Sequence, residues 1–255
     1  MKEVLVVGEL TKTYGKGSAA THALDGVSLA LQPGEFVGIM GPSGSGKTTL
    51  LNCIATIDRP TSGSIVIDGR ELTRLKGREL TQFRRERLGF IFQDCNLLDT
   101  LTAFENIALA LSIVGAPTKD IARRVQETAQ RLGIADCLEK YPYQMSGGQQ
   151  QRCAAARAIV THPALVLADE PTGALDSRSA RMLLERMEEL NRDLGTTILM
   201  VTHDAFTASC CRRVIFLQDG KILLQLHRQG EDRRAFFQQI IQVVSKMGGE
   251  MADVL

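Results

Sequence analysis

The clearest chemical motif in the sequence is a glycine-rich segment that follows a short apolar run. Residues 41–48 read GPSGSGKT and fit the pattern GxxxxGK[ST]. Glycines let backbone N–H groups close around phosphate oxygens, and the start of a following helix adds partial positive charge. Lys47 is placed to reach the β- and γ-phosphates of a nucleotide, and the Thr48 hydroxyl is a ligand for Mg²⁺. The segment predicts a phosphate-binding loop made of Gly41, Pro42, Ser43, Gly44, Ser45, Gly46, Lys47 and Thr48.

A pair of acidic residues stands at the end of a second apolar run. The run 165–168 has the composition of a buried strand, and Asp169 and Glu170 follow it. Asp169 can hold a metal ion through its water shell, and Glu170 can polarise a water molecule beside a γ-phosphate. The alternative is a strand that ends in a solvated acidic turn. Beside a phosphate-binding loop, the pair favours a site that hydrolyses a nucleotide.

A third motif combines a serine with two glycines before a helical segment. Ser146, Gly147, Gly148 and Gln149 can bind an oxyanion through backbone N–H groups at a helix start. The alternative is a loop in which the serine only caps the helix. The residues alone leave both readings open. Asp176 likewise stands where it can cap the next helix.

Two single residues follow predicted strands. Gln93 comes just after the apolar run 88–92, where a side chain can reach a metal ion or an attacking water. His203 follows the run 197–202. A lone histidine is more often structural than catalytic, and the residue by itself leaves the choice open.

The elements that position these motifs alternate between strands and helices. Short β-branched and apolar runs predict strands, and Asp68-Gly69 and Asp219-Gly220 predict hairpin turns. Phe36 to Met40 is nearly all apolar, which is typical of a strand buried on both faces. A helix is expected over 48–56. The other predicted strands are 4–7, 23–31, 65–67, 88–92, 165–168, 197–202, 213–217 and 222–226.

Between residues 101 and 158 the pattern is mostly helical. Ile121, Val125, Ala129 and Leu132 fall on one face of a helix that Pro117 precedes and Gly133 follows. This region is expected to form an α-helical lobe inserted between strands. A second amphipathic helix carries Leu183, Met187, Leu190 and Leu194. The alternation of strand and helix predicts an α/β fold.

Composition restricts the function classes. The chain has 255 residues, 44% of them hydrophobic, and its net charge is +1, so a whole-protein basic field for nucleic acid is absent. No run of 18 apolar residues predicts a membrane span, and the first residues lack the architecture of a signal peptide. The six cysteines match no zinc spacing and are expected to stay reduced as packing residues.

Taken together, the motifs resemble the nucleotide-binding subunit of an ABC (ATP-binding cassette) transporter over about residues 2–227. The phosphate loop resembles the family's Walker A motif. Residues 165–170 resemble its Walker B motif with the catalytic glutamate, and residues 146–150 resemble its signature motif. Gly173 departs from this pattern, where many members have Ser, and so does Cys153, where a β-branched residue is common. Neither departure removes a group that the chemistry needs. The resemblance places Gln93 in the family's Q-loop, Asp176 in its D-loop and His203 in its H-loop. It also implies that Tyr14 stacks on adenine and that Thr49 is a further nucleotide contact.

The resemblance implies a P-loop NTPase sheet core with an N-terminal antiparallel β region and a helical subdomain at about 94–157, within a cassette spanning 1–227. It also implies two cassettes, expected to be identical, that sandwich two ATP molecules with Mg²⁺. Ser146 of one cassette would close on the nucleotide of the other. Glu170 would be the general base, His203 would hold the γ-phosphate and the water, and Thr48, Gln93 and Asp169 would serve the metal ion. The ATPase would lie at the cytoplasmic face of a membrane and move a separate permease, and no nucleic-acid partner is implied.

The finer resemblance is to cassettes of lipoprotein release, macrolide export and antimicrobial-peptide resistance. It rests on 63–92, on the segment DEPTGALDS and on the tail 228–255. The tail carries an apolar stripe, which packs on its own cassette or meets a partner. It resembles the tails of peptide-resistance cassettes, which implies a sensor kinase reached through the permease. The stripe consists of Phe236, Ile240, Val243 and Met247, beside Phe237, Ile241 and Val244.

Two other classes of protein fit the sequence less well. One is a soluble ABC protein that acts on ribosomes or DNA, and the other is a P-loop kinase or GTPase. The sequence lacks the motifs typical of either class.

Overall fold

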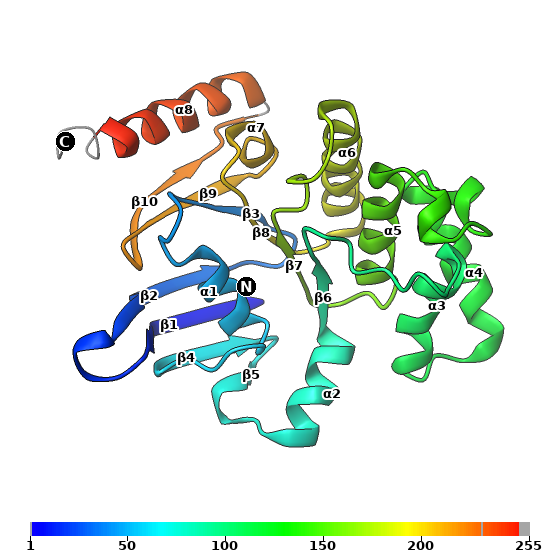
Figure 1. Cartoon of the computed structure of the whole chain (residues 1–255), viewed down its shortest axis with the longest axis horizontal. Coiled ribbons are helices and arrows are strands. Elements are labelled where there is room, and N and C mark those ends of the chain that lie inside the picture. The colour runs from blue at the N-terminus through cyan, green and yellow to red at the C-terminus, as the bar shows by residue number, and fades with distance from the viewer. Residues whose placement is uncertain (1, 231, 250–255) are drawn as a thin grey trace. The chain divides into compact units, whose positions relative to one another are not determined.

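A computed structural model describes residues 2–230 and 232–249 of the chain. The chain forms two compact units (Figure 1). The first combines Met1–Leu75 with Leu199–Leu255, and the second is Lys76–Ile198. Each unit holds part of the predicted motifs, and each is described separately below.

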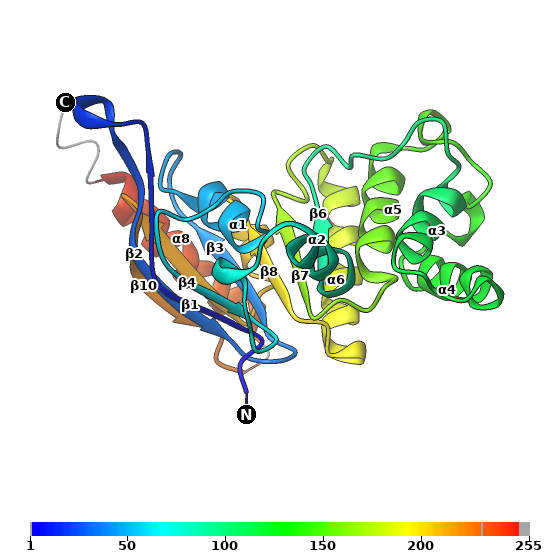
Figure 2. The ribbon, with the colours of Figure 1, turned by 90° about the horizontal axis from the view of Figure 1, so that it is seen from below.

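The first unit contains an antiparallel sheet in the order β2-β1-β4-β5 (Figure 1). Figure 2 shows its strands β1, β2 and β4 from another side. Along β1, Leu5, Val7 and Leu10 are buried while their neighbours are partly exposed, as expected for a sheet with one face toward the core. This sheet confirms the predicted N-terminal antiparallel region. The strands are β1 (Leu5–Tyr14), β2 (Thr21–Leu31), β4 (Ser62–Ile67) and β5 (Arg70–Glu71).

A second run of strands in this unit has the order β10-β9-β3-β8. The predicted all-apolar strand is β3 (Phe36–Met40), and all of its residues are buried. It pairs in parallel with β9 (Arg213–Gln218), which turns through Asp219 and Gly220 into β10 (Lys221–His227). Both turn residues have positive φ, as the sequence signal predicts. The remaining elements are β8 (Ile198–Val201), α1 (Lys47–Ile54), α7 (Ala205–Ala208), α8 (Arg233–Gly249), η1 (Gly17–Ala19) and η2 (Leu72–Arg74).

The second unit pairs two parallel strands with helices. β6 (Leu88–Ile91) lies beside β7 (Leu165–Asp169) in parallel register. The predicted helical region is confirmed, and the stripe on α4 buries Val125 and Ala129, with Leu132 just past its end. The helices are α2 (Gly77–Arg87), α3 (Ala103–Ile113), α4 (Thr118–Arg131), α5 (Gly147–Ile159) and α6 (Ser177–Leu194), with η3 (Ala135–Cys137) and η4 (Pro142–Gln144).

Two apolar stripes differ in detail from their predictions. On α6, Leu194 is exposed although its stripe is otherwise buried, because the helix ends there and Gly195 takes a left-handed conformation. On α8, Phe236 and Ile240 are buried against the cassette's own unit, while Ile241 and Val244 are exposed. One row of the stripe therefore packs on its own unit, and the neighbouring row is partly exposed. Glu231 and residues 250–255 of the predicted tail lie outside the described residues.

The state of the cysteines and the character of the helices can be compared with what the sequence predicts. All six cysteines are free thiols, and all but Cys95 are buried. None of the helices in the described part of the chain combines the length and apolar character that a bilayer crossing requires.

Candidate nucleotide-binding site

The glycine-rich loop between β3 and α1 has a shape that its glycines alone allow. Gly46 has φ 99°, and a Cβ there would overlap the Ala23 carbonyl. A Cβ at Gly41 would overlap the Leu217 carbonyl. Gly44 has φ 81° and faces open space, with no atom within 4 Å of the position of a Cβ. The loop is thus closed toward the protein and open on another side, as a phosphate cradle requires.

The start of α1 combines a glycine N-cap with the positive charge of Lys47. Its N-cap, Gly46, makes no side-chain cap hydrogen bond, and the first turn has no acidic residue. The Lys47 Nζ donates to the carbonyl oxygens of Gly41 and Pro42, each at 2.8 Å. The ammonium is therefore held over the loop, where the helix dipole already favours an anion. Thr48 is exposed and Thr49 half-buried on the first turn of α1.

Tyr14 and His203 also belong to the first unit. Tyr14 ends β1 with 43% of its side chain exposed. His203 is exposed between two anchored residues. The Thr202 N–H donates to the Ile39 carbonyl of β3 at 3.1 Å, and the Asp204 carboxylate accepts the N–H groups of Phe206 and Thr207 as the cap of α7. The backbone on both sides of His203 is thereby fixed.

In the second unit, the end of β7 lies against Gln93. Asp169 is the last residue of β7, and Glu170 follows with φ 45°, a conformation that L-residues seldom adopt. The Gly173 N–H donates to the Glu170 carbonyl at 3.0 Å. A Cβ at Gly173 would lie 3.4 Å from the carboxamide of Gln93. The structure thus brings Gln93 and the turn after Glu170 together, and Gly173 leaves room for the amide.

The signature residues begin α5 with a capping box. The Ser146 Oγ accepts the Gln149 N–H at 3.3 Å, and the Ser146 N–H donates to Gln149 Oε1 at 2.9 Å. The helix-capping alternative is therefore observed. The same Ser146 hydroxyl keeps its own proton, so capping leaves it a donor for a further oxyanion.

The signature also lies against the D-loop, through a residue that the sequence did not single out. Gly148 lies so close to Ser179 that a Cβ would collide with its side chain. The Ser179 hydroxyl donates to Asp176 Oδ2 at 2.7 Å, and Asp176 caps α6 through the N–H groups of Arg178 and Ser179. Hydrogen bonds from Ser179 hold the pKa of Asp176 below its ordinary value.

The donors proposed for Mg²⁺ are all oxygen groups: the Thr48 hydroxyl and the Gln93 amide as ligands, and the Asp169 carboxylate through the water shell of the metal. The described residues contain no cluster of three or more His, Cys, Asp or Glu side chains that could hold a metal ion. Mg²⁺ bound to a nucleotide typically takes one or two protein ligands, phosphate oxygens and waters. The donor set fits that chemistry and needs no cage made of protein alone.

Comparisons with known proteins extend these observations to the whole chain. The profile of the ABC transporter family matches residues 24–173. The bacitracin export ATP-binding protein BceA of Halalkalibacterium halodurans is 50% identical over 250 residues, covering 98% of this chain and 99% of its own length. The macrolide export ATP-binding/permease protein MacB of Aggregatibacter actinomycetemcomitans is 43% identical over 86% of this chain but only 34% of its own length.

A solved structure shows the same fold. The ATP-binding cassette MJ0796 of Methanocaldococcus jannaschii, in a dimeric post-hydrolysis state bound to ADP and Pi, matches with a TM-score of 0.80. The sequences are 39% identical, and the match covers 89% of this chain and all of the other. The predicted fold class is thereby confirmed.

Proposed function

Since the chain belongs to the ABC transporter family, as an ATP-binding and ATP-hydrolysing subunit, we propose that it powers a separate membrane permease that removes peptide antibiotics. The observation that carries the peptide assignment is the 50% identity to a bacitracin export ATP-binding protein over nearly the full length of both chains. A macrolide exporter is less similar and matches through only a third of its length.

The first unit binds the nucleotide in this proposal. The N–H groups at the start of α1 and the ammonium of Lys47 hold the phosphates, because both favour an anion there. Tyr14 presents an exposed ring for stacking on the adenine. Mg²⁺, held by Thr48, Gln93 and Asp169, would neutralise charge on the phosphates.

Glu170 serves as the general base for hydrolysis. Its carboxylate accepts a proton from water as the water oxygen bonds to the γ-phosphorus, and ADP leaves with the electron pair of the broken bond. The positive φ of Glu170 is a strained conformation of the kind that functional sites retain. His203, on a backbone anchored at both sides, holds the γ-phosphate and the water.

The active unit is a pair of cassettes. Ser146 of each chain closes on the nucleotide bound by the other, with its hydroxyl proton as the donor. The dimeric solved cassette supports this arrangement. Binding of ATP favours the closed pair, and that population shift moves the permease.

The permease contact and the wider pathway complete the proposal. The helical lobe at about 94–157 docks on the cytoplasmic side of the permease, so the chain lies peripherally at that face of the membrane. A sensor kinase reached through the permease detects the peptide. The segment 1–227 is the cassette in this scheme, and 228–255 is its tail.

Deletion of the gene tests the peptide assignment. The deletion strain is expected to become sensitive to bacitracin and related cell-wall-active peptides. The wild-type gene restores resistance and Glu170→Gln does not. Unchanged peptide sensitivity with a new defect in macrolide efflux or lipoprotein release would move the assignment to those neighbouring systems, as the similarity to MacB allows.

A further inference from the structure

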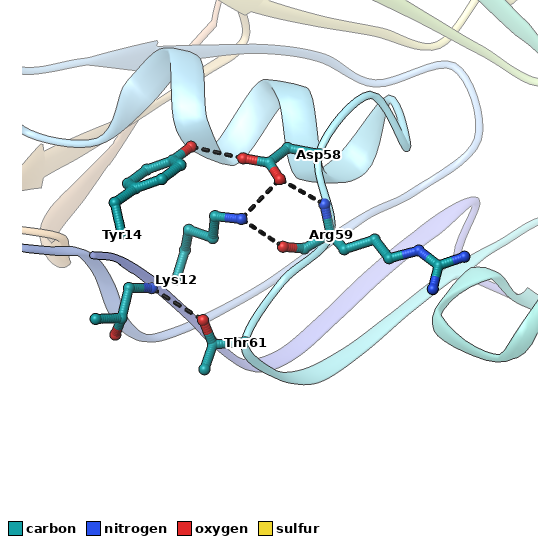
Figure 3. Close-up of polar contacts among 6 residues, drawn as sticks. Lys12, Tyr14, Asp58, Arg59 and Thr61 are labelled. Atoms are coloured by element: carbon teal, nitrogen blue, oxygen red, sulfur yellow. Dashed lines mark hydrogen bonds and ion pairs between the residues drawn. The ribbon is translucent and has the colours of Figure 1, made fainter. Parts of the chain in front are cut away.

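A polar cluster surrounds the base-stacking residue Tyr14, and it includes two residues outside every recognised motif (Figure 3). The Tyr14 hydroxyl donates to Asp58 Oδ2 at 2.6 Å. The Lys12 ammonium donates to Asp58 Oδ1 at 2.6 Å and to the Arg59 carbonyl at 2.7 Å. Both oxygens of the Asp58 carboxylate therefore bind side chains of β1, although 44 or more residues separate them in sequence.

Lys12 also covers one face of the Tyr14 ring. The two residues alternate along β1, so their side chains lie on the same side of the strand. The Lys12 Nζ stands over the ring, 4.7 Å from its centroid. Lys12 is buried, whereas 43% of Tyr14 is exposed. The ammonium thus backs the ring, and a large part of Tyr14 stays exposed.

The backbone on both sides of this cluster is anchored as well. Between Lys12 and Tyr14, the Thr13 N–H donates to the Thr61 hydroxyl at 3.0 Å (Figure 3). The Asp58 N–H donates to the Asn52 carbonyl of α1 at 3.1 Å. Asp58 is therefore tied to the helix that carries the phosphate loop at its other end.

The charges of the cluster reinforce its hydrogen bonds. Hydrogen bonds from Lys12 and then from Tyr14 lower the pKa of Asp58. The hydrogen bond to Asp58 raises the pKa of Tyr14. At neutral pH the tyrosine is a neutral donor and the aspartate an ionised acceptor, which is the stronger kind of hydrogen bond.

We propose that Lys12 and Asp58 are positioning residues that hold the Tyr14 ring in the orientation in which it stacks on the base of the nucleotide. The inference rests on the proposed function, because it takes Tyr14 as the stacking residue. A ring fixed before binding loses less side-chain entropy when the base arrives. The clamp formed by Lys12, Tyr14 and Asp58 also joins the base platform to α1, so that base and phosphate sites keep a constant spacing.

The test compares a ligand that has a base with one that lacks it. Calorimetry on the full-length chain measures the affinities of Mg-ATP and of inorganic tripolyphosphate with Mg²⁺. Asp58→Asn is expected to weaken ATP binding about three- to tenfold, since the ring must then be ordered on binding, and to change tripolyphosphate binding less than about twofold. Lys12→Met should act in the same direction.

A matched control and a second variant accompany the test. Asp25 forms an exposed ion pair with Lys221 at 3.0 Å, so Asp25→Asn removes an equivalent charge pair away from the clamp and should alter neither affinity. Tyr14→Phe keeps the ring but removes the hydroxyl that binds Asp58. Tyr14→Phe should also weaken ATP binding more than tripolyphosphate binding, but by a smaller factor. If Asp58→Asn does not fold, Tyr14→Phe serves as the test of the clamp.

The possible results distinguish a failure of the proposed clamp from a failure of the proposed function. An equal loss for both ligands would show that Asp58 acts through the fold of α1, and unchanged ATP binding would show that the ring needs no clamp. Either result overturns the inference. If Tyr14→Ala leaves ATP affinity unchanged, the stacking role proposed for Tyr14 fails, and if the wild-type chain binds no ATP, the proposed nucleotide site itself fails.

Discussion

Two helices of the cassette begin with glycine-rich motifs, and they leave their first N–H groups in different states. At α1 the N-cap is Gly46, which has no side chain with which to cap the helix. At α5 the N-cap is Ser146, and a capping box with Gln149 satisfies donors on both sides. Neither first turn contains an acidic residue, so both helix dipoles still favour an anion.

The difference bears on the proposal that the two helix starts share one nucleotide. The start of α1 has no N-cap side chain, and the Lys47 ammonium stands over its loop, so this helix start suits tight binding of phosphates. The start of α5 is stable alone and contributes a hydroxyl that the cap has oriented. We infer that the first binds the nucleotide in its own chain and the second completes the site of the partner chain later. The following predictions test this division, beginning with the largest expected effect.

Glu170→Gln should separate binding from hydrolysis. Removing a general base lowers rates by about 10² to 10⁴, whereas neither helix start is altered. The variant should bind ATP with wild-type affinity, and gel filtration with Mg-ATP should show a stable pair of chains, because the base is lost while the shape is kept. Phosphate release measures the rate. A variant that retains half of the wild-type rate, or that never pairs even with its permease present, would contradict this role.

Lys47→Ala should damage the start of α1 and nothing else. Hydrogen bonds to charged groups are worth about 1.5–3 kcal/mol, so ATP affinity should fall about 10- to 150-fold. Calorimetry measures the loss. Lys119→Ala, an exposed lysine on α4, is the matched control and should leave the affinity unchanged. A loss below about twofold would place phosphate binding elsewhere.

Substitutions at Ser146 should separate the cap from the hydroxyl donor. Ser146→Ala removes both and should cost about 1 kcal/mol of unfolding free energy together with ATPase activity. Ser146→Asp keeps a good N-cap but has no proton to donate, so the stability should remain while hydrolysis falls about tenfold or more. Urea unfolding and phosphate release measure the two effects. If Ser146→Asp hydrolyses ATP at the wild-type rate, the hydroxyl has no role beyond the cap.

The clamp beside Tyr14 should produce the smallest effect, seen as a pH dependence of stability. Because the pKa of Asp58 is lower in the folded chain, its contribution is present above the ordinary aspartate pKa of about 3.9 and is lost as pH falls through the lowered value. Asp58→Asn should therefore cost at most about 1 kcal/mol at pH 7 and nothing once the carboxylate is protonated. Urea unfolding at several pH values measures this difference, and a cost that grows toward acid pH would refute it.

Local signals predicted much of the fold. The bounds of β3 follow from its apolar run, and both hairpin turns follow from Asp-Gly pairs whose residues take positive φ. The helix α2 escaped prediction because Phe83 is its only buried residue, which leaves no apolar stripe to recognise. The apolar spacing assigned Leu194 to the buried face of α6, but Leu194 is exposed. Such a spacing does not predict at which residue the helix ends.

The residues of the candidate site likewise divide into those that the sequence predicts and those that it misses. Motif residues such as Lys47, Glu170 and Ser146 were identified because their spacing in sequence reflects one loop or one strand end. Asp58 and Ser179 were not, since each meets its partners through the fold: Asp58 reaches β1 across 44 residues and Ser179 contacts Gly148. Contacts of this kind leave no periodic signal in a single sequence.

Mixing two impaired variants tests the division between α1 and α5 most directly. Full-length Lys47→Ala and Ser146→Asp chains, each with strongly reduced ATP hydrolysis when alone, are combined in equal amounts and phosphate release is measured. A mixed pair holds one intact site, made from the α1 start of one chain and the α5 start of the other, so the mixture should recover up to about a quarter of wild-type activity. A mixture that remains as inactive as its components would contradict the completion of the site by the partner chain.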